Sequence, residues 1–212
     1  MQKPAGVSSE AEGMGRLIAQ ALSLRDDQIY PVHRLDRDVG GVMVYALSRR
    51  AAAVLSQASA EHRMRKTYLA LAQGNPTAEK GRWEDLLYHD ARRNKTFVVD
   101  RPRRGVKPAA LEYRILRRIP ADLPENDTGR DLSMLEIQLE TGRSHQIRVQ
   151  CASRGLPLIG DRKYGGAAWR EIGLYAWKLS FPDPETGKEK EYRMETCIPF
   201  LNRPKTDNLN PD

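Results

Sequence analysis

One acidic and two basic side chains of this 212-residue chain have types and spacings that could carry out chemistry. The acidic one, Asp36, lies in the segment His-Arg-Leu-Asp-Arg-Asp-Val-Gly-Gly, which covers residues 33–41. Its paired glycines allow the backbone to turn tightly or to pass close to a ligand. A carboxylate in such a turn can serve as a nucleophile, a general base or a metal ligand, or it can simply cap the turn.

The two basic side chains are Arg143 and Arg148, in Thr-Gly-Arg-Ser-His-Gln-Ile-Arg at 141–148. Arg143 belongs to the turn before a predicted helix, where unpaired backbone N–H groups favour phosphate binding. Arg148 lies about one turn into that helix and could pair with a buried carboxylate. Such a pair would keep the carboxylate ionised, as a nucleophile requires. Two structural salt bridges explain the same spacing equally well.

Tyr68 is a candidate for contact with a planar ligand, and its pattern leaves that role open. It lies in the alternating segment 66–73, which predicts a strand. A tyrosine on a strand either packs in the core or offers its ring to a nucleobase. The four histidines show no close ligand spacing, so the sequence predicts no metal site.

The positive charge of the chain is concentrated in one stretch. The formal net charge is +7 with a pI near 9.5, and residues 92–118 hold ten basic side chains against two acidic ones. Eight of the ten are arginines, which form two-pronged contacts with phosphates and stack on bases where lysine cannot. A clustered excess of this kind predicts a nucleic-acid contact surface; a solvated charged face is the alternative.

The elements that must position these side chains are mostly strands. Ser48 is a predicted N-cap for an alanine-rich helix that ends near Met64, and another helix is expected from about Ser144 to Gly155. We also expect a short helix over 10–24, strands over 42–47, 66–73, 96–99, 109–116, 132–140, 174–181 and 190–196, and a loop over 119–131. Strands that follow one another directly favour an α+β fold on a largely antiparallel sheet.

The bulk features of the chain bound the remaining classes. Its length supports one substantial core, and we expect a single domain over residues 1–201 followed by a loose polar tail over 202–212. Two cysteines outside any Cys-x-x-Cys, no membrane-length apolar stretch and no signal-peptide core predict a cytoplasmic, reduced protein without membrane contact. No Gly-x-Gly-x-x-Gly and no P-loop occurs, which argues against a nucleotide-binding enzyme.

Four motifs in order give the sequence a family resemblance. They are His-Arg-Leu-Asp at 33–36, Lys-Thr-Tyr at 66–68, the 141–148 motif and Gly-Asp-Arg-Lys-Tyr-Gly at 160–165, preceded by Lys-Pro-Ala-Gly at 3–6. From about Lys3 to Phe181 the chain resembles the RluA-type RNA pseudouridine synthases. The resemblance implies a pseudouridine synthase-like fold, α+β, with a largely antiparallel mixed sheet flanked by helices and loops.

The same resemblance implies an isomerase that breaks the N1–C1′ bond of a uridine in RNA, rotates the base and rejoins it through C5, without cofactor or metal. Asp36 would be the nucleophile, attacking C1′ of the ribose or C6 of the base, and Arg148 would position it. Tyr68 would stack on the target base and assist proton removal at C5. The alternative is a catalytically silent RNA-binding protein on the same scaffold, which would have no use for a carboxylate facing an anionic ligand.

RNA contacts follow from the resemblance and from the basic stretch. Arg34 would fill the space left when the uridine flips out of the RNA, Arg143 would hold phosphates, and His145 and Gln146 of the same motif are expected at the RNA. Ribosomal RNA is expected as the target before transfer RNA, because many compact members act there, and the expected state is a monomer. The arginines of the basic stretch expected to contact RNA are Arg92, Arg93, Arg101, Arg103 and Arg104.

The sequence departs from the family pattern in three places. Val39-Gly40-Gly41 stands where members usually read Thr-Ser-Gly, a change we expect to alter local packing more than catalysis. Gln150 stands where histidine is common, which we expect to be neutral. We also expect no small basic RNA-binding module before Lys3, so that target selection would rest on the catalytic domain and on residues 92–118.

Overall fold

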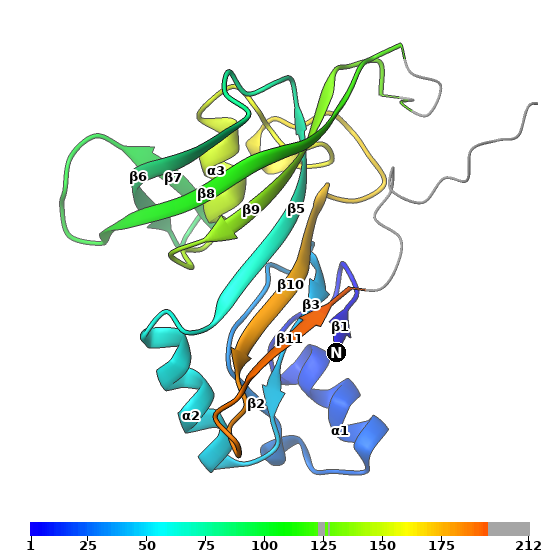
Figure 1. The fold of residues 1–212 in the computed structure, drawn as a ribbon, viewed down its shortest axis with the longest axis vertical. Coiled ribbons are helices and arrows are strands. Elements are labelled where there is room, and N and C mark those ends of the chain that lie inside the picture. Colours follow the sequence, from blue (N-terminus) through cyan, green and yellow to red (C-terminus); the bar gives the residue numbers. More distant parts are fainter. Residues whose placement is uncertain (123–125, 127, 195–212) are drawn as a thin grey trace, which may run out of the picture.

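The computed structural model describes residues 1–122, 126 and 128–194, and strands dominate it (Figure 1). The strands are β1 (Gln2–Lys3), β2 (Tyr30–Pro31), β3 (Gly40–Val42), β4 (Tyr45–Ala46), β5 (Arg65–Gln73), β6 (Lys80–Asp90), β7 (Lys95–Val99), β8 (Val106–Ile119), β9 (Leu132–Leu139), β10 (Leu174–Pro182) and β11 (Glu189–Arg193). The helices are α1 (Arg16–Leu22), α2 (Arg49–Ala60) and α3 (Gln146–Ala152), with short helical turns at Ala11–Gly15, Asp26–Gln28 and Arg162–Tyr164. The expected α+β class is confirmed.

One long sheet organises the described part of the chain. Its strands follow the order β1-β3-β10-β5-β9-β8-β6-β7, with β11 beside β10, while β2 and β4 form a separate pair. Within the described residues β3 and β10 run parallel and the other pairs antiparallel. In Figure 1, β5 runs from the half that contains β6–β9 and α3 to the half that contains α1 and α2. The sheet is therefore the common support of segments that are far apart in sequence.

Strand β5 is covered on both faces over its central part, which explains the uninterrupted apolar run from Tyr68 to Ala72. Tyr68, Ala70 and Ala72 belong to one core cluster, together with Ile147 of α3. Leu69 and Leu71 belong to a second cluster. The alternation expected for residues 66–73 is confirmed, and the face that carries Tyr68 is the one that α3 covers.

The strand expected over 42–47 is instead two short strands, β3 and β4, which belong to different sheets. The break falls at Met43 and Val44, whose backbone N–H groups find partners outside any ladder. Met43 donates to the carbonyl of Met1 at 2.9 Å, and Val44 donates to Nε2 of His33 at 3.2 Å. The run is apolar enough for one strand, but the tertiary partners of its backbone divide it.

The other elements match the expectations with shifted ends. Ser48 caps α2 by accepting from the Ala51 N–H at 3.2 Å, as predicted. Helix α3 begins only at Gln146, because His145 has a left-handed backbone with φ of 53°. Strand β6 was not expected, since charged residues interrupt its apolar pattern; it forms because β7 and β8 pair with its backbone on either side.

Three of the expected segments lie partly or wholly outside the described residues. Strand β8 extends to Ile119, so the loop expected over 119–131 starts one residue later, and 123–125 and 127 lie outside the described residues. Strand β11 matches the first part of the strand expected over 190–196, whose end lies outside them, as does the expected tail. The division into a domain over 1–201 and a tail over 202–212 stays a prediction. Over the ranges described here, no helix is long and apolar enough to cross a membrane.

Candidate active site

Asp36 lies in the loop between β2 and β3, and the buried ammonium group of Lys3 fastens that loop from the N-terminal side. Lys3 is 2% exposed. Its Nζ donates to the carbonyl of Arg37 at 3.0 Å and to the carbonyls of Pro4 and Val7 at 3.0 and 2.7 Å. All three ammonium protons are therefore used, and the first of them fixes the residue next to Asp36.

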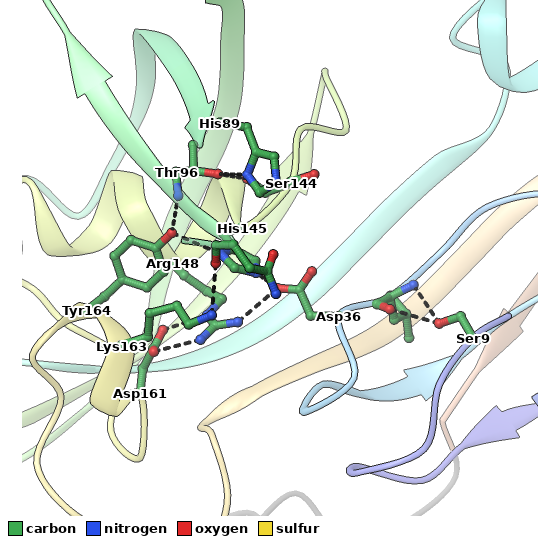
Figure 2. A network of polar contacts seen from close by, with 12 residues as sticks. Ser9, Asp36, His89, Thr96, Ser144, His145, Arg148, Asp161, Lys163 and Tyr164 are labelled. Carbon is green, nitrogen blue, oxygen red and sulfur yellow. Dashed lines mark hydrogen bonds and ion pairs between the residues drawn. The ribbon is translucent and has the colours of Figure 1, made fainter. Parts of the chain in front are cut away.

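Two further residues of the N-terminal segment hold the same loop. The hydroxyl of Ser9 donates to the carbonyl of Leu35 at 2.8 Å and accepts from the Leu35 N–H at 3.1 Å (Figure 2). The N–H of Gly6 donates to the carbonyl of Arg37 at 2.8 Å. Both backbone neighbours of Asp36 are thus fixed by hydrogen bonds, so the place of its backbone is determined independently of the contacts to its carboxylate.

The carboxylate of Asp36 faces Arg148 of α3. Arg148 Nη1 donates to Asp36 Oδ2 at 3.1 Å, while Nε and Nη2 form a two-pronged pair with Asp161 at 2.7 and 2.8 Å (Figure 2). The side chains of Arg148, Asp161 and Asp36 are 5%, 0% and 24% exposed. Burial acts to lower the pKa of Arg148, but the two carboxylates outweigh it and raise that pKa. The guanidinium is therefore a permanent charge that one buried acid anchors and the other shares.

His145 approaches Asp36 from the residue just before α3. Its Nε2 lies 3.8 Å from Asp36 Oδ2, and its Nδ1 is 2.9 Å from the hydroxyl of Tyr164. That hydroxyl also accepts from the backbone N–H of Thr96 at 2.8 Å, and the Thr96 side chain donates to the carbonyl of Ser144 at 2.8 Å. Figure 2 shows this chain of contacts running from the strand side of the site to Asp36.

A cavity of about 280 Å³ opens in front of Asp36. Its lining includes the three residues predicted to be catalytic, Asp36, Tyr68 and Arg148, and also His145 and Lys66. These residues come from the β2–β3 loop, β5 and α3, so the fold brings the sequence motifs to one place. In the described ranges, no group of three or more His, Cys, Asp or Glu side chains is arranged to hold a metal ion.

Burial shifts the pKa values of two side chains on β5 so that the charged form of each is disfavoured. Burial raises the pKa of Tyr68, and the nearby charge of Asp36 raises it further. Burial also lowers the pKa of Lys66. Both shifts disfavour the charged form, so the Tyr68 hydroxyl keeps its proton at neutral pH.

Comparison with known proteins explains why these motifs occur together. A family model described as RNA pseudouridylate synthase matches residues 1–153. The chain belongs to the RNA pseudouridylate synthase family. It is 33% identical over 196 residues to an uncharacterised RNA pseudouridine synthase of Bacillus subtilis. The match covers 88% of this chain and 61% of that protein. It is 41% identical over 170 residues to an uncharacterised RNA pseudouridine synthase of Chloroflexus aurantiacus, with 76% and 48% covered.

Solved structures agree with the fold. Human RNA pseudouridylate synthase domain containing 1 superposes with a TM-score of 0.75 at 23% identity, covering 94% of this chain and 79% of that chain. Human RNA pseudouridylate synthase domain containing 4 gives 0.72 at 21% identity, covering 94% and 85%. The family and the fold expected from the motifs are therefore confirmed. The chain spans about half to three fifths of the length of the curated relatives it matches.

The residues expected at RNA lie in different settings. Arg34 is exposed at the cavity, with Nη1 3.7 Å from Glu10, and Arg143 lines the cavity while its Nε donates to the carbonyl of Pro108 at 3.0 Å. His145 is buried beside Asp36 and also lines the cavity. The contacts of these three residues with RNA stay predictions.

Gln146 lines the cavity, but three of the four hydrogen-bonding positions of its side chain are used within the protein. It is 2% exposed. Its Oε1 accepts from the N–H of Arg143 at 3.0 Å and from the hydroxyl of Thr141 at 2.8 Å, and its Nε2 donates to the carbonyl of Ala110 at 3.0 Å. Gln146 holds the turn that carries Arg143, which is a role in positioning.

The basic stretch divides into two parts. Arg114 and Arg118, on β8, pair with Glu136 and Glu79 at 2.7 and 2.5 Å, so their charges are compensated. The arginines at the β6–β7 turn and the β7–β8 loop, at 92, 93, 101, 103 and 104, are all exposed. Figure 1 shows the β7–β8 loop projecting from the edge of the molecule. Both parts are exposed, and they differ in that the charges of Arg114 and Arg118 are compensated by glutamates, while the second part lies on turns and loops.

Sequence reasoning named the segments that contain Lys3, Asp161 and Tyr164 but gave these residues no role. Their signal was their place in the 3–6 and 160–165 motifs. Each acts through a partner elsewhere in the sequence: Lys3 through Arg37, Asp161 through Arg148, and Tyr164 through His145. Such pairings can be recognised only in the folded structure.

The departures from the family pattern have structural consequences. Val39 is buried in the core cluster that contains Tyr68, so an apolar side chain fits there. A Cβ on Gly41, whose φ is 132°, would lie 2.3 Å from the carbonyl oxygen of Ala176 on β10, so this position accepts only glycine. Gln150 donates to Asp85 at 2.6 Å, but its Oε1 is a buried acceptor without a partner among the described residues. Gln150 is thus tolerated with one polar atom unsatisfied.

Proposed function

We propose that this chain isomerises a uridine in RNA to pseudouridine, with Asp36 as the nucleophile. The observation that carries the proposal is the setting of Asp36. Its carboxylate lies in a cavity wall, partly open, and is paired with Arg148, which buried Asp161 anchors. A guanidinium held in this way attracts and orients the carboxylate without filling the space in front of it. Membership of the family supports the same reaction.

Two routes fit this arrangement. In the first, an Asp36 oxygen bonds to C1′ of the ribose as the N1–C1′ bond breaks and leaves its electron pair on the base. The base turns, C5 bonds to C1′ and displaces the carboxylate, the C5 proton passes to a base and N1 takes up a proton. In the second, the same oxygen first adds to C6 of the pyrimidine and the C5=C6 electron pair moves into the ring. The N1–C1′ bond then breaks, the ring turns and C5 bonds to C1′. Loss of the C5 proton then expels the carboxylate from C6, and N1 takes up a proton. Both need a carboxylate of fixed direction, which the pairing with Arg148 supplies.

Tyr68 contributes its ring to this mechanism. Because burial raises the pKa of its hydroxyl, Tyr68 is a poor proton acceptor at neutral pH. The ring can stack on the target base from the wall of the cavity, where it lies beside Asp36. The carboxylate that is released when C5 bonds to C1′ is then the stronger acceptor for the C5 proton.

The size of the cavity supports a single base as its occupant. About 280 Å³ holds one pyrimidine and excludes a stacked duplex, so the target uridine would have to leave its helix. Arg34, exposed at the cavity, is suited to fill the gap left behind, and Arg143 is suited to hold a phosphate at the entrance. Two relatives, from Zymomonas mobilis and Borreliella burgdorferi, are named ribosomal large subunit pseudouridine synthase D, which supports ribosomal RNA as the target.

The experiment that tests the proposal is release of tritium from RNA labelled at uridine C5, with unmodified ribosomal and transfer RNA supplied separately. We expect release by the native protein from ribosomal RNA and none by Asp36→Asn, which is nearly isosteric and lacks the charged oxygen. The variant should bind RNA at least as tightly, because one negative charge is removed. Full-rate release by Asp36→Asn overturns the mechanism. Absence of release by the native protein, with RNA bound, indicates the silent RNA-binding protein.

The exposed arginines are tested by the salt dependence of RNA affinity. Changing Arg101 and Arg104 to alanine removes two exposed charges, and we expect the slope of log K against log salt to fall by about two. The matched control changes Arg114 and Arg118 to alanine, which removes two charges already paired with glutamates. Equal slopes for the two variants would show that the β7–β8 loop does not contact phosphate.

A further inference from the structure

We propose that Tyr164 and His145 form a positioning pair for Asp36, in which the Tyr164 hydroxyl fixes the tautomer of His145 so that its Nε2–H faces the carboxylate. The inference rests on the proposed function, because it explains how the nucleophile is aimed. It concerns two residues that lie outside the Asp36, Tyr68 and Arg148 set.

The contacts on the two sides of the His145 ring favour one tautomer. On one side, Nδ1 lies 2.9 Å from the hydroxyl of Tyr164, which accepts from the backbone N–H of Thr96 at 2.8 Å and also contacts the Thr96 side chain. On the other side, Nε2 lies 3.8 Å from Asp36 Oδ2, and a carboxylate can only accept. The proton of the neutral ring is therefore favoured on Nε2, which leaves Nδ1 as an acceptor for the Tyr164 hydroxyl.

That tautomer directs a partial positive charge at the nucleophile. Nε2 lies 3.8 Å from Asp36 Oδ2, the oxygen that Arg148 Nη1 contacts at 3.1 Å. The other tautomer would place a lone pair against the same oxygen and repel it. With both contacts on Oδ2, Oδ1 is the oxygen left to attack the substrate. His145 and Arg148 thus restrict the carboxylate from two directions.

The surroundings of His145 keep its ring neutral, as the pair requires. Burial lowers the pKa of His145 below its usual value. Asp36 acts to raise it, but Arg148, Lys163 and His89 all lower it. Tyr164 faces the remaining ring nitrogen with its hydroxyl. A neutral ring with one N–H can serve as a directed donor without placing a second full charge beside Arg148.

The backbone at His145 is held in an unusual conformation that serves this geometry. Its φ of 53° and ψ of 23° lie in the left-handed region, which is unfavourable for an L residue with a side chain. The carbonyl of His145 still accepts the first helical hydrogen bond of α3, from Val149 at 3.0 Å. Residues retained in such conformations concentrate at functional sites.

The tautomer can be observed directly by NMR of the protein labelled with ¹⁵N-histidine. We expect the Nδ1 resonance of His145 at the position of a bare nitrogen and Nε2 at that of a protonated one. Tyr164→Phe, which removes only the hydroxyl, should convert His145 to a mixture. A native His145 with its proton on Nδ1 overturns the proposal. This readout needs no turnover, so its failure is distinct from failure of the proposed activity.

Kinetics test whether the pair acts on the nucleophile. We expect Tyr164→Phe to lower kcat for tritium release roughly tenfold with KM unchanged, because a misaimed carboxylate slows chemistry and leaves RNA binding intact. His145→Asn should do the same, since asparagine tolerates the left-handed backbone. The control is Tyr113→Phe, which makes the same change at a tyrosine that contacts the carbonyl of Ala78 and is not among the residues that line the cavity. An equal loss in Tyr113→Phe, or a native kcat in Tyr164→Phe, overturns the proposal.

Discussion

The two sides of the loop that carries Asp36 hold it in different ways. On the N-terminal side, Lys3 and Ser9 contact only the backbone of the loop. On the side of α3, Arg148 and His145 approach the carboxylate itself. Backbone contacts fix where the loop lies and leave the chemistry of the side chain unchanged, whereas contacts to the carboxylate determine its direction. Variants on the first side should therefore lower mainly the free energy of unfolding, whereas variants on the second side should also lower the catalytic rate by a large factor.

The largest effect is expected for Arg148→Ala. It leaves Asp161, whose side chain is fully buried, without its partner, which should lower the free energy of unfolding by about 3–5 kcal/mol. It also removes the group that orients Asp36, so kcat should fall by roughly a hundredfold to a thousandfold. Urea unfolding and tritium release measure the two losses. A variant that keeps native kcat would contradict the division between the two sides.

A double variant separates the two consequences of losing Arg148. Arg148→Met with Asp161→Leu replaces the buried pair by apolar side chains, which is often neutral for stability. We expect the free energy of unfolding to return to within about 1 kcal/mol of the native value while tritium release stays as low as in Arg148→Ala. Recovery of activity together with stability would mean that Arg148 acts only through the fold.

Lys3→Met should give the largest effect on the N-terminal side. Three carbonyl groups lose a charged donor in a buried place, which should lower the free energy of unfolding by about 3 kcal/mol. Because the carboxylate contacts of α3 remain, kcat at a temperature where the protein is folded should fall less than about tenfold. A hundredfold loss of kcat with native stability would reverse the assignment of the two sides.

The neutral, buried ring of His33, at the start of the loop, should make the stability of the protein depend on pH. Burial lowers the pKa of His33 to about 3, and its Nε2 accepts from the N–H of Val44. The unfolded chain takes up this proton near pH 6.5 and the folded chain only near pH 3. Between these values the unfolded state binds more protons, so stability falls as pH falls, by about 1.4 kcal/mol per pH unit. Urea unfolding between pH 7 and 4 measures the free energy of unfolding as a function of pH. Its slope against pH should be flatter for His33→Asn than for the native protein. Equal slopes for the two proteins would contradict a neutral, buried His33 ring.

The smallest effect is expected for Arg37→Ala. Arg37 is exposed, and its Nε donates to the carbonyl of Gly6 at 2.9 Å, a contact that water can replace. The free energy of unfolding should change by less than about 1 kcal/mol, and kcat should not change measurably. Because Arg37 lies next to Asp36, it also serves as the control for Lys3→Met. A loss as large as that of Lys3→Met would mean that the exposed contact, and not the buried ammonium, holds the loop.

The strands with strong local patterns could be predicted from the sequence, and those defined by their neighbours could not. The alternation of residues 66–73 identified β5 and its two faces. Strand β6 has charged residues at Arg82, Glu84 and Asp85, so no local pattern marks it, and pairing with β7 and β8 forms it. The apolar run at 42–47 was divided because its backbone groups bind Met1 and His33.

The candidate site shows the same division at the level of side chains. Asp36, Arg148 and Tyr68 could be predicted because their motifs are recognisable in the chain. Asp161 could not be assigned to Arg148, because a carboxylate partner is identified only by proximity. The burial of Gln146, and hence the use of its amide groups within the protein, could not be predicted for the related reason that its motif does not show which groups surround it.

The sequence by itself determined the family, the α+β class and the residue types of the site, because motif order and local periodicity are properties of the chain alone. Tertiary structure alone decided which groups meet at Asp36 and which arginines remain exposed. The physical reason is that a hydrogen bond or ion pair acts over a few ångströms, while Asp36 and Arg148 are 112 residues apart in sequence. Only the folding of β5, β10 and α3 around one core brings such groups within that distance.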